Sequence, residues 1–185
     1  MTISEAPLSV PTSTASVPPS ATPEALHVSE PEVPWAEDWG GEGSGVRLKL
    51  LMADVEGAVF TVRIQMRPGT QLPPHLHTGA VHAFTHAGEW CYLEYPDSPS
   101  SRAGSYLYEP AGSTHTLKVS DTCPEVTDAT FIVHGAMIHY AEDGSVAAVG
   151  DAATHLRDYF AALRAQGTPL PKLIRGGTSG YTDEA

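Results

Sequence analysis

Two stretches of this chain carry the clearest signals of its fold: PPHLHTGAVHAFTHAGEWCYLEY, residues 73–95, and SYLYEPAGSTHTL, residues 105–117. Both alternate short apolar runs with histidines, glycines and prolines. The first contains His75 and His77, and residues two apart in a strand point to the same face of a sheet. Both imidazoles can therefore reach a single ion, although an H-x-H pair on its own also occurs in ordinary polar patches.

Short strands and turns continue on both sides of these stretches. In residues 58–66 apolar and polar side chains alternate, which is the period of a half-buried strand. Its apolar face comprises Phe60, Val62, Ile64 and Met66. We predict further strands over residues 46–54, 81–87, 89–95, 105–110, 115–120, 127–135, 136–143 and 145–150. Many short strands at close spacing, separated by Gly and Pro, predict an all-β sandwich or barrel.

We divide the chain into three segments. Residues 1–33 are dominated by Pro, Ser, Thr and Ala, which bury too little apolar surface to order the chain, so we expect a flexible arm. Residues 34–150 form the β domain, and we expect Trp35 and Trp39 to cover one end of its core. Residues 151–185 form a C-terminal helix and tail.

The C-terminal helix is predicted over residues 152–165. Gly167 supplies its stop signal, and we expect the tail over 168–185 to lie across the surface or to fray. The apolar residues recur at the spacing of one helical face, which predicts packing against the outside of the barrel. That face comprises Leu156, Tyr159, Phe160 and Leu163.

Composition excludes some classes of function. The chain has 185 residues and a formal net charge of -12, so phosphate backbones would repel it and nucleic-acid binding is not expected. Cys91 and Cys123 are too few for a disulfide framework. No apolar run reaches the roughly 18–20 residues of a membrane span, and the N-terminus has no basic region of a secretory signal. We therefore expect a cytoplasmic protein that does not bind membranes.

Glycines and a proline frame the histidines in two ordered motifs. They read G-x5-H-x-H, from Gly69 to His77, and G-x5-P-x-G-x2-H, from Gly104 to His115. These patterns resemble the paired motifs of the cupin superfamily. The resemblance covers about residues 46–150 and implies a single-domain jelly-roll barrel that carries one metal ion inside. The metal ligands that it implies are His75, His77 and His115.

Two departures from the cupin pattern affect this site. Val81 and His82 stand where the first motif usually supplies a glutamate ligand, and Val119 replaces the asparagine that often ends the second. Three neutral imidazoles with open positions would remain, and imidazole ligands suit zinc, copper, iron and nickel alike. His82 either substitutes for the glutamate or lies on the outer face of its strand. We expect His134 and His139 to be structural, hydrogen-bonded side chains.

A narrower resemblance is carried by HTGAVHAFTHAGEWCYLEY, residues 77–95, and by residues 105–117. These stretches are similar to the 2,4'-dihydroxyacetophenone dioxygenase-like proteins, neighbours of the acetylacetone-cleaving dioxygenases. The resemblance implies a mononuclear non-haem Fe2+, with Zn2+ or another divalent metal as the alternative. It also implies cleavage by O2 of the carbon–carbon bond between a ketone carbon and its hydroxymethyl neighbour, which gives a carboxylic acid and formate.

Such a reaction needs a group that takes a proton from the ketone, and three residues are candidates. Tyr92 and Glu94 share a strand face with Trp90, and that face either points inward or leaves Glu94 in solvent. Glu109 precedes Pro110, on the strand face opposite the two tyrosines of YLYE. We keep Glu94, Tyr92 and Glu109 as catalytic candidates.

The function that these observations favour is an iron dioxygenase acting on a small, aromatic hydroxyketone or diketone and O2. A redox-neutral metal-dependent isomerase or hydrolase and a non-catalytic metal-binding sensor module remain open alternatives. We also expect a homodimer, because an acidic barrel with exposed edge strands can pair them with a second copy.

Overall fold

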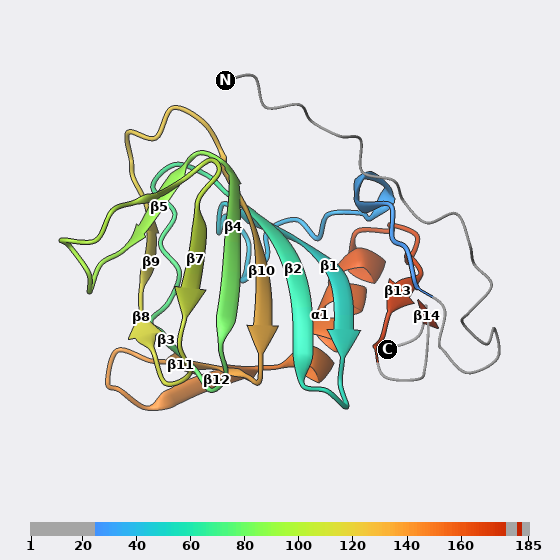
Figure 1. Cartoon of the computed structure of the whole chain (residues 1–185). Coiled ribbons are helices and arrows are strands. Elements are labelled where there is room, and N and C mark those ends of the chain that lie inside the picture. The colour runs from blue at the N-terminus through green and yellow to red at the C-terminus, as the bar shows by residue number, and fades with distance from the viewer. Residues whose placement is uncertain (1–24, 177–180, 183–185) are drawn as a thin grey trace, which may run out of the picture.

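The computed structural model describes residues 25–176 and 181–182. Its largest sheet has seven strands in the order β14-β13-β1-β2-β10-β4-β7 and forms one wall of the molecule (Figure 1). The strands are β1 (Val46–Asp54), β2 (Val59–Met66), β4 (Val81–Ala87), β7 (Tyr106–Glu109), β10 (Thr127–His134), β13 (Leu173–Ile174) and β14 (Tyr181–Thr182).

Two smaller sheets complete the fold. The four-stranded sheet has the order β12-β11-β3-β8, and its strands are β3 (His75–His77), β8 (Thr114–His115), β11 (Met137–Tyr140) and β12 (Val146–Gly150). The three-stranded sheet has the order β6-β5-β9, with β5 (Glu89–Tyr92), β6 (Ser101–Arg102) and β9 (Leu117–Val119). The prediction of an all-β domain with one C-terminal helix is confirmed.

Alternation of apolar and polar residues places the core between the sheets. In β2 every second residue is buried, beginning at Phe60, and Met66 at its end is fully buried. The inward residues gather in two clusters, one around Phe60 and Leu50 and the other around Trp90 and Met66. The face predicted from the period of two is therefore the face that the fold buries.

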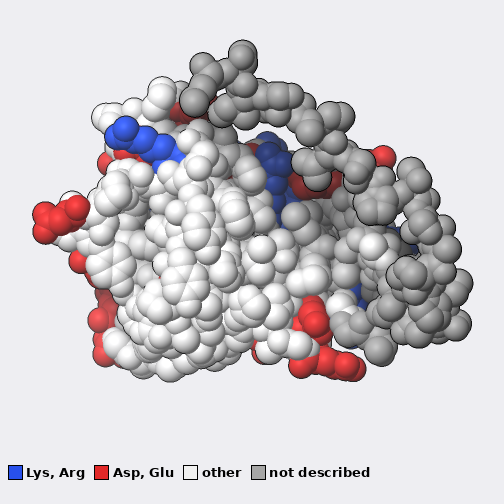
Figure 2. Space-filling model, in the orientation of Figure 1, with Lys and Arg blue, Asp and Glu red and all other residues white. Residues whose placement is uncertain are grey.

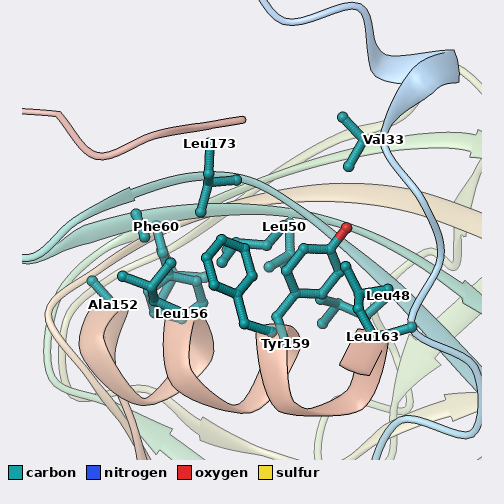
Figure 3. Packing of buried hydrophobic residues seen from close by; sticks show 14 of the residues in the cluster. Val33, Leu48, Leu50, Phe60, Ala152, Leu156, Tyr159, Leu163 and Leu173 are labelled. Carbon is teal, nitrogen blue, oxygen red and sulfur yellow. The ribbon is translucent and has the colours of Figure 1, made fainter. Parts of the chain in front are cut away.

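The helix α1 (Ala152–Ala165) has the bounds that the sequence predicts. Asp151 caps it, because its side chain accepts from the backbone N–H of Thr154 while the Thr154 hydroxyl accepts from the Asp151 backbone. Figure 3 shows the buried face of the helix lying against residues of β1 and β2. The four residues of the predicted stripe, which are Leu156, Tyr159, Phe160 and Leu163, are all buried.

Ordered structure begins earlier than the expected boundary at residue 34. Residues 1–24 lie outside the described part, but Glu30–Glu32 form a 3-10 helix and Val33 is buried. Glu30 forms salt bridges with Lys49 (2.8 Å) and Arg63 (2.6 Å), so charge as well as apolar burial holds this segment on the sheet. Composition alone could not reveal these pairings, because their partners lie far along the chain.

The two tryptophans next to this segment have different surroundings. Trp39 packs against both hydrophobic clusters, as expected of a residue that closes the core. Trp35 instead makes cation–π contacts with Arg47 and Lys49, whose charged groups lie 4.6 and 4.7 Å from the centroid of its ring. Trp35 therefore contributes to the contact between the N-terminal segment and β1.

The start of the C-terminal tail joins the sheet. Ile174 in β13 pairs in parallel with Met52 in β1, and Leu173 is fully buried. The expectation that this part of the tail lies on the surface or frays is therefore wrong, because its apolar residues complete the core beside α1. Residues 177–180 and 183–185 lie outside the described part of the chain.

The outer face of the large sheet is divided into two halves. Charged side chains and the N-terminal segment cover the half near β1, whereas Figure 2 shows an almost uncharged face over β10, β4 and β7. Phe84, Tyr106 and Tyr108 are exposed there, and β7 forms the edge of the sheet. Within the described ranges, no helix combines the length and apolar character that crossing a membrane requires.

Candidate metal centre

Three buried histidines converge inside the fold. His75 and His77 belong to β3, whose antiparallel pairing with β8 sets His115 directly opposite His75. All three are 4 % exposed or less, and one nitrogen of each lies within 4.8 Å of the others. The structure thus brings together the three histidines that the two motifs predict, in an arrangement that could hold a metal ion.

A backbone carbonyl orients the side chain of His75. The carbonyl oxygen of Pro73 lies 2.8 Å from Nδ1 of His75, and a carbonyl can only accept, so Nδ1 carries the hydrogen. Nε2 of His75 then keeps its lone pair for an ion, which is the usual arrangement for a metal-binding histidine. Gly112 donates its N–H to the carbonyl of His77 (2.7 Å), which ties the second motif to the first.

Burial keeps two of the imidazoles uncharged. It lowers the pKa of His75 to about 4, against a hydrogen bond to Pro73 that acts in the opposite direction. It likewise lowers the pKa of His77 to about 4, although the Glu109 carboxylate favours the charged form. Because a histidine binds a metal in its neutral form, both are ready to act as ligands at neutral pH.

A carboxylate completes the cluster from the end of β7. Oε2 of Glu109 lies 3.0 Å from Nε2 of His77 and 3.2 Å from Nε2 of His115, and the side chain is 3 % exposed. The cupin glutamate is absent from its usual place in the first motif, but the fold brings Glu109 to the same histidines from the second. The sequence indicates this position, because residues alternate between the two faces of a strand and Glu109 therefore lies on the face opposite Tyr106 and Tyr108.

Tyr92 holds this carboxylate. Its hydroxyl donates a hydrogen bond to Oε1 of Glu109, and its ring stacks on His115 with centroids 3.8 Å apart. Burial raises the pKa of Glu109, but interactions with His115, Tyr92 and His77 outweigh it and leave the pKa below its ordinary value. Burial and the neighbouring carboxylate raise the pKa of Tyr92 well above its ordinary value. The pair is therefore an ionised carboxylate and a neutral phenol.

The donor set fits a metal ion. Among the described residues, four of the cluster's buried polar atoms have no hydrogen-bond partner: Nδ1 of His77, both ring nitrogens of His115 and Oε2 of Glu109. Buried polar atoms normally have partners, because leaving them unpaired is costly. Three imidazoles and one carboxylate are donors that suit Zn2+ and Fe2+ alike.

The other candidates are not members of this cluster. Glu94 follows the end of β5, so strand parity no longer governs it, and its carboxylate accepts from the backbone N–H and hydroxyl of Thr116, both at 2.7 Å. Burial opposes ionisation of Glu94, but these bonds outweigh it and lower its pKa. His82 lies on the outer face, hydrogen-bonded to Tyr106 at 2.7 Å, which matches the second of the two interpretations given for it.

Two cavities meet at the cluster. The larger, of about 420 Å³, is lined by His75, His77 and mostly apolar side chains of both hydrophobic clusters. The smaller, of about 360 Å³, is lined by His115 and by residues of β5, β7 and the loop after β5. Tyr92 and Glu109 line both, so this pair stands between them.

Comparison with known proteins places this geometry in context. A family model described as the ChrR Cupin-like domain matches residues 24–138. No curated protein matches the chain. Among solved structures, a protein of unknown function with a cupin-like fold from Ralstonia eutropha JMP134 is 30% identical, with a TM-score of 0.75. The alignment covers 87% of this chain and 98% of that one.

Two further structures share the fold at lower identity. An RmlC-like cupin protein from Ralstonia eutropha JMP134 is 23% identical, with a TM-score of 0.73 and coverage of 82% of this chain and 94% of that one. An acetylacetone dioxygenase from Acinetobacter johnsonii is 19% identical, with a TM-score of 0.63 and coverage of 76% and 93%. At these identities the likeness extends to the fold alone.

Proposed function

We propose that this chain, which belongs to the ChrR Cupin-like domain family, is a mononuclear non-haem iron dioxygenase. Its substrate is a small, largely apolar ketone, either a hydroxyketone or a diketone, and O2 cleaves the carbon–carbon bond next to the carbonyl. The observation that carries the proposal is the cluster of three imidazoles and one carboxylate at the wall of an apolar cavity.

The cavity matches such a substrate in size and character. A volume of about 420 Å³ lies in the range of small-molecule sites, which are mostly apolar with a few convergent polar groups. Here the walls come from both hydrophobic clusters, while His75, His77, Tyr92 and Glu109 supply polar groups on one side. A ketone bound there would have its carbonyl near the histidines and its apolar remainder against the core.

Each residue of the cluster has a defined task in this proposal. His75, His77 and His115 would hold iron, which would polarise the ketone and mediate electron transfer from the substrate to O2. Glu109 would take the proton that the ketone loses from the carbon beside its carbonyl, because this buried carboxylate lines the cavity with Oε2 beside the histidines. Tyr92 keeps Glu109 ionised and oriented through the hydrogen bond to Oε1.

For a hydroxyketone the reaction balances without a further reactant. R–CO–CH2OH and O2 give R–COOH and HCOOH, so both oxygen atoms of O2 enter the two acids and the substrate supplies all the electrons. An acetylacetone dioxygenase from Acinetobacter johnsonii shares this fold.

A redox-neutral metal enzyme is the second candidate, and the donor set is the observation that favours it. Three histidines and a carboxylate suit zinc, and a zinc-bound water would serve hydrolysis or isomerisation. The two candidates separate on one measurement, because only the dioxygenase consumes O2.

The test is oxygen uptake by the metal-loaded protein. Protein freed of metal and reloaded anaerobically with Fe2+ should consume one O2 for each 2-hydroxyacetophenone or 2,4-pentanedione converted, and protein loaded with Zn2+ should consume none. Glu109→Gln should lower the turnover rate by 100-fold or more, in the range of general acid–base catalysis. Glu89→Gln, which changes an exposed carboxylate paired with Arg102, is the matched control. Iron-loaded protein that takes up no O2 with either ketone would refute the proposal.

A further inference from the structure

A fourth histidine continues the row of imidazoles beyond the proposed ligands. In the four-stranded sheet His75 pairs with His115 on one side and with His139 of β11 on the other. Directly paired residues in antiparallel strands place their side chains on the same face. The ring centroids of His75 and His139 are 5.5 Å apart, and both side chains line the larger cavity. The expectation that His139 has a merely structural role does not account for this position.

A fifth histidine reaches the same cavity from the helix. His155 lies in the first turn of α1 and lines the cavity together with His139. Its ring stacks on Phe60, with centroids 4.1 Å apart, and more distantly on Trp39. A Cβ on Gly150 would lie 3.0 Å from Cε1 of His155 and 3.8 Å from Nε2 of His139, so the glycine leaves space for both rings.

A hydrogen bond to the backbone determines which ring nitrogen of His155 carries the hydrogen. Nδ1 of His155 lies 2.9 Å from the carbonyl oxygen of Asp151, which can only accept, so Nδ1 carries the hydrogen. Burial lowers the pKa of His155, so its ring is neutral at neutral pH. A neutral ring with its hydrogen on Nδ1 has a lone pair on Nε2. Nε2 of His155 can therefore accept a hydrogen bond, and this residue lines a mostly apolar cavity.

We infer that His155 and His139 form a second recognition subsite, which selects a ligand bearing a hydrogen-bond donor on the part remote from its ketone. This inference rests on the proposed function for the placement of the ketone at His75 and His77. His155 supplies the acceptor, and His139 lies beside His75 between the metal cluster and the helix. A ligand without a donor leaves the acceptor unpaired when it displaces water, which is how a polar subsite discriminates.

Binding of two matched probes tests the subsite without turnover. The dissociation constants of 4-hydroxyacetophenone and acetophenone are measured by calorimetry on the Zn2+-loaded protein, in which no oxygen chemistry interferes. We expect the hydroxylated probe to bind about tenfold more tightly, in the range of one hydrogen bond to a buried acceptor. His155→Phe, which keeps an aromatic ring on Phe60, should remove this preference. His155→Gln, which keeps an acceptor near the place of Nε2, should restore part of it.

Controls separate the subsite from folding and from the proposed reaction. His134→Phe changes an exposed histidine on β10 and should leave the preference unchanged. Each variant should retain one metal ion per chain, which reports an intact cluster. Equal affinities for the two probes in the unaltered protein, or a preference that persists in His155→Phe, would refute the subsite. If the preference behaves as expected but iron-loaded protein consumes no O2, the subsite stands and the dioxygenase proposal falls.

Discussion

The hydroxyl of Tyr92 donates a hydrogen bond to Glu109, and the other oxygen of that carboxylate lies 3.0 Å from Nε2 of His77. One buried tyrosine thus links the aromatic core of the barrel to the histidine cluster. The ring stacks on His115 while the hydroxyl fixes the carboxylate, so Tyr92 positions two members of the cluster at once.

Tyr92→Phe removes this hydrogen bond while retaining the ring. We expect the free energy of unfolding to fall by about 2 kcal/mol, because a buried ionised carboxylate loses a donor and hydrogen bonds to charged groups contribute about 1.5–3 kcal/mol. Urea unfolding of the metal-free protein measures the change. Tyr95→Phe, at an exposed tyrosine, is the matched control and should cost under about 0.5 kcal/mol. Equal effects of the two substitutions would contradict the role assigned to Tyr92.

Glu109→Gln tests whether the carboxylate supports metal binding. We expect the affinity for Zn2+ or Co2+ to fall by roughly 10- to 100-fold, the usual effect of removing a group that supports metal ligands. Competition with a chromophoric chelator measures the affinity, and the absorption spectrum of bound Co2+ reports any change in its surroundings. Glu89→Gln serves again as the control. An unchanged affinity and spectrum would show that Glu109 acts on the substrate alone.

Stability of the metal-free protein should depend on pH through His75 and His77. Their folded-state pKa of about 4 lies below the ordinary value of 6.5, so between these values the unfolded chain binds more protons than the folded one. Stability is therefore fully present above pH 6.5 and is lost as the pH falls toward 4. The loss is at most roughly 1.4 kcal/mol per pH unit for each histidine. The lowered pKa of Glu109 acts in the same direction, but only as the pH falls below its ordinary value of 4.5.

Urea unfolding of chelator-treated protein at pH 7.5 and pH 5 measures this dependence. His75→Gln and His77→Gln should each weaken the pH dependence of the free energy of unfolding, since each removes one group whose pKa is lower in the folded protein than in the unfolded chain. A free energy of unfolding that is the same at both pH values, in the unaltered protein, would contradict the prediction.

Gly88→Ala should destabilise the fold at the turn between β4 and β5. Gly88 has a φ of +71°, and a Cβ there would lie 2.6 Å from Cα of Thr127, which is backbone and cannot move aside. We expect a loss above about 2 kcal/mol, because the clash adds to the cost of a left-handed conformation. Gly104→Ala is the matched control: its φ is +87°, but the added Cβ meets nothing within 4 Å. Thermal or urea unfolding of both variants should show the smaller loss at Gly104.

Local sequence patterns are enough to predict the long strands, the helix and the three convergent histidines. Strand faces follow from a period of two and the helical stripe from a period of 3.6, both local properties that Phe60 and Leu156 illustrate. The motif spacing identified His75, His77 and His115 through resemblance to a family, and the pairing of β3 with β8 brings them together.

Which other side chains join these histidines depends on contacts between segments that are distant in the sequence. The end of β5 removes Glu94 from the face of Tyr92, and the pairing of β4 with β7 carries Glu109 inward to His77. His155 reaches the cavity because α1 packs beside Phe60, far from it in sequence. Periodicity specifies which face a residue occupies, but sheet closure and helix docking specify which residues of distant segments meet. Those contacts depend on long-range pairing, which no local pattern encodes.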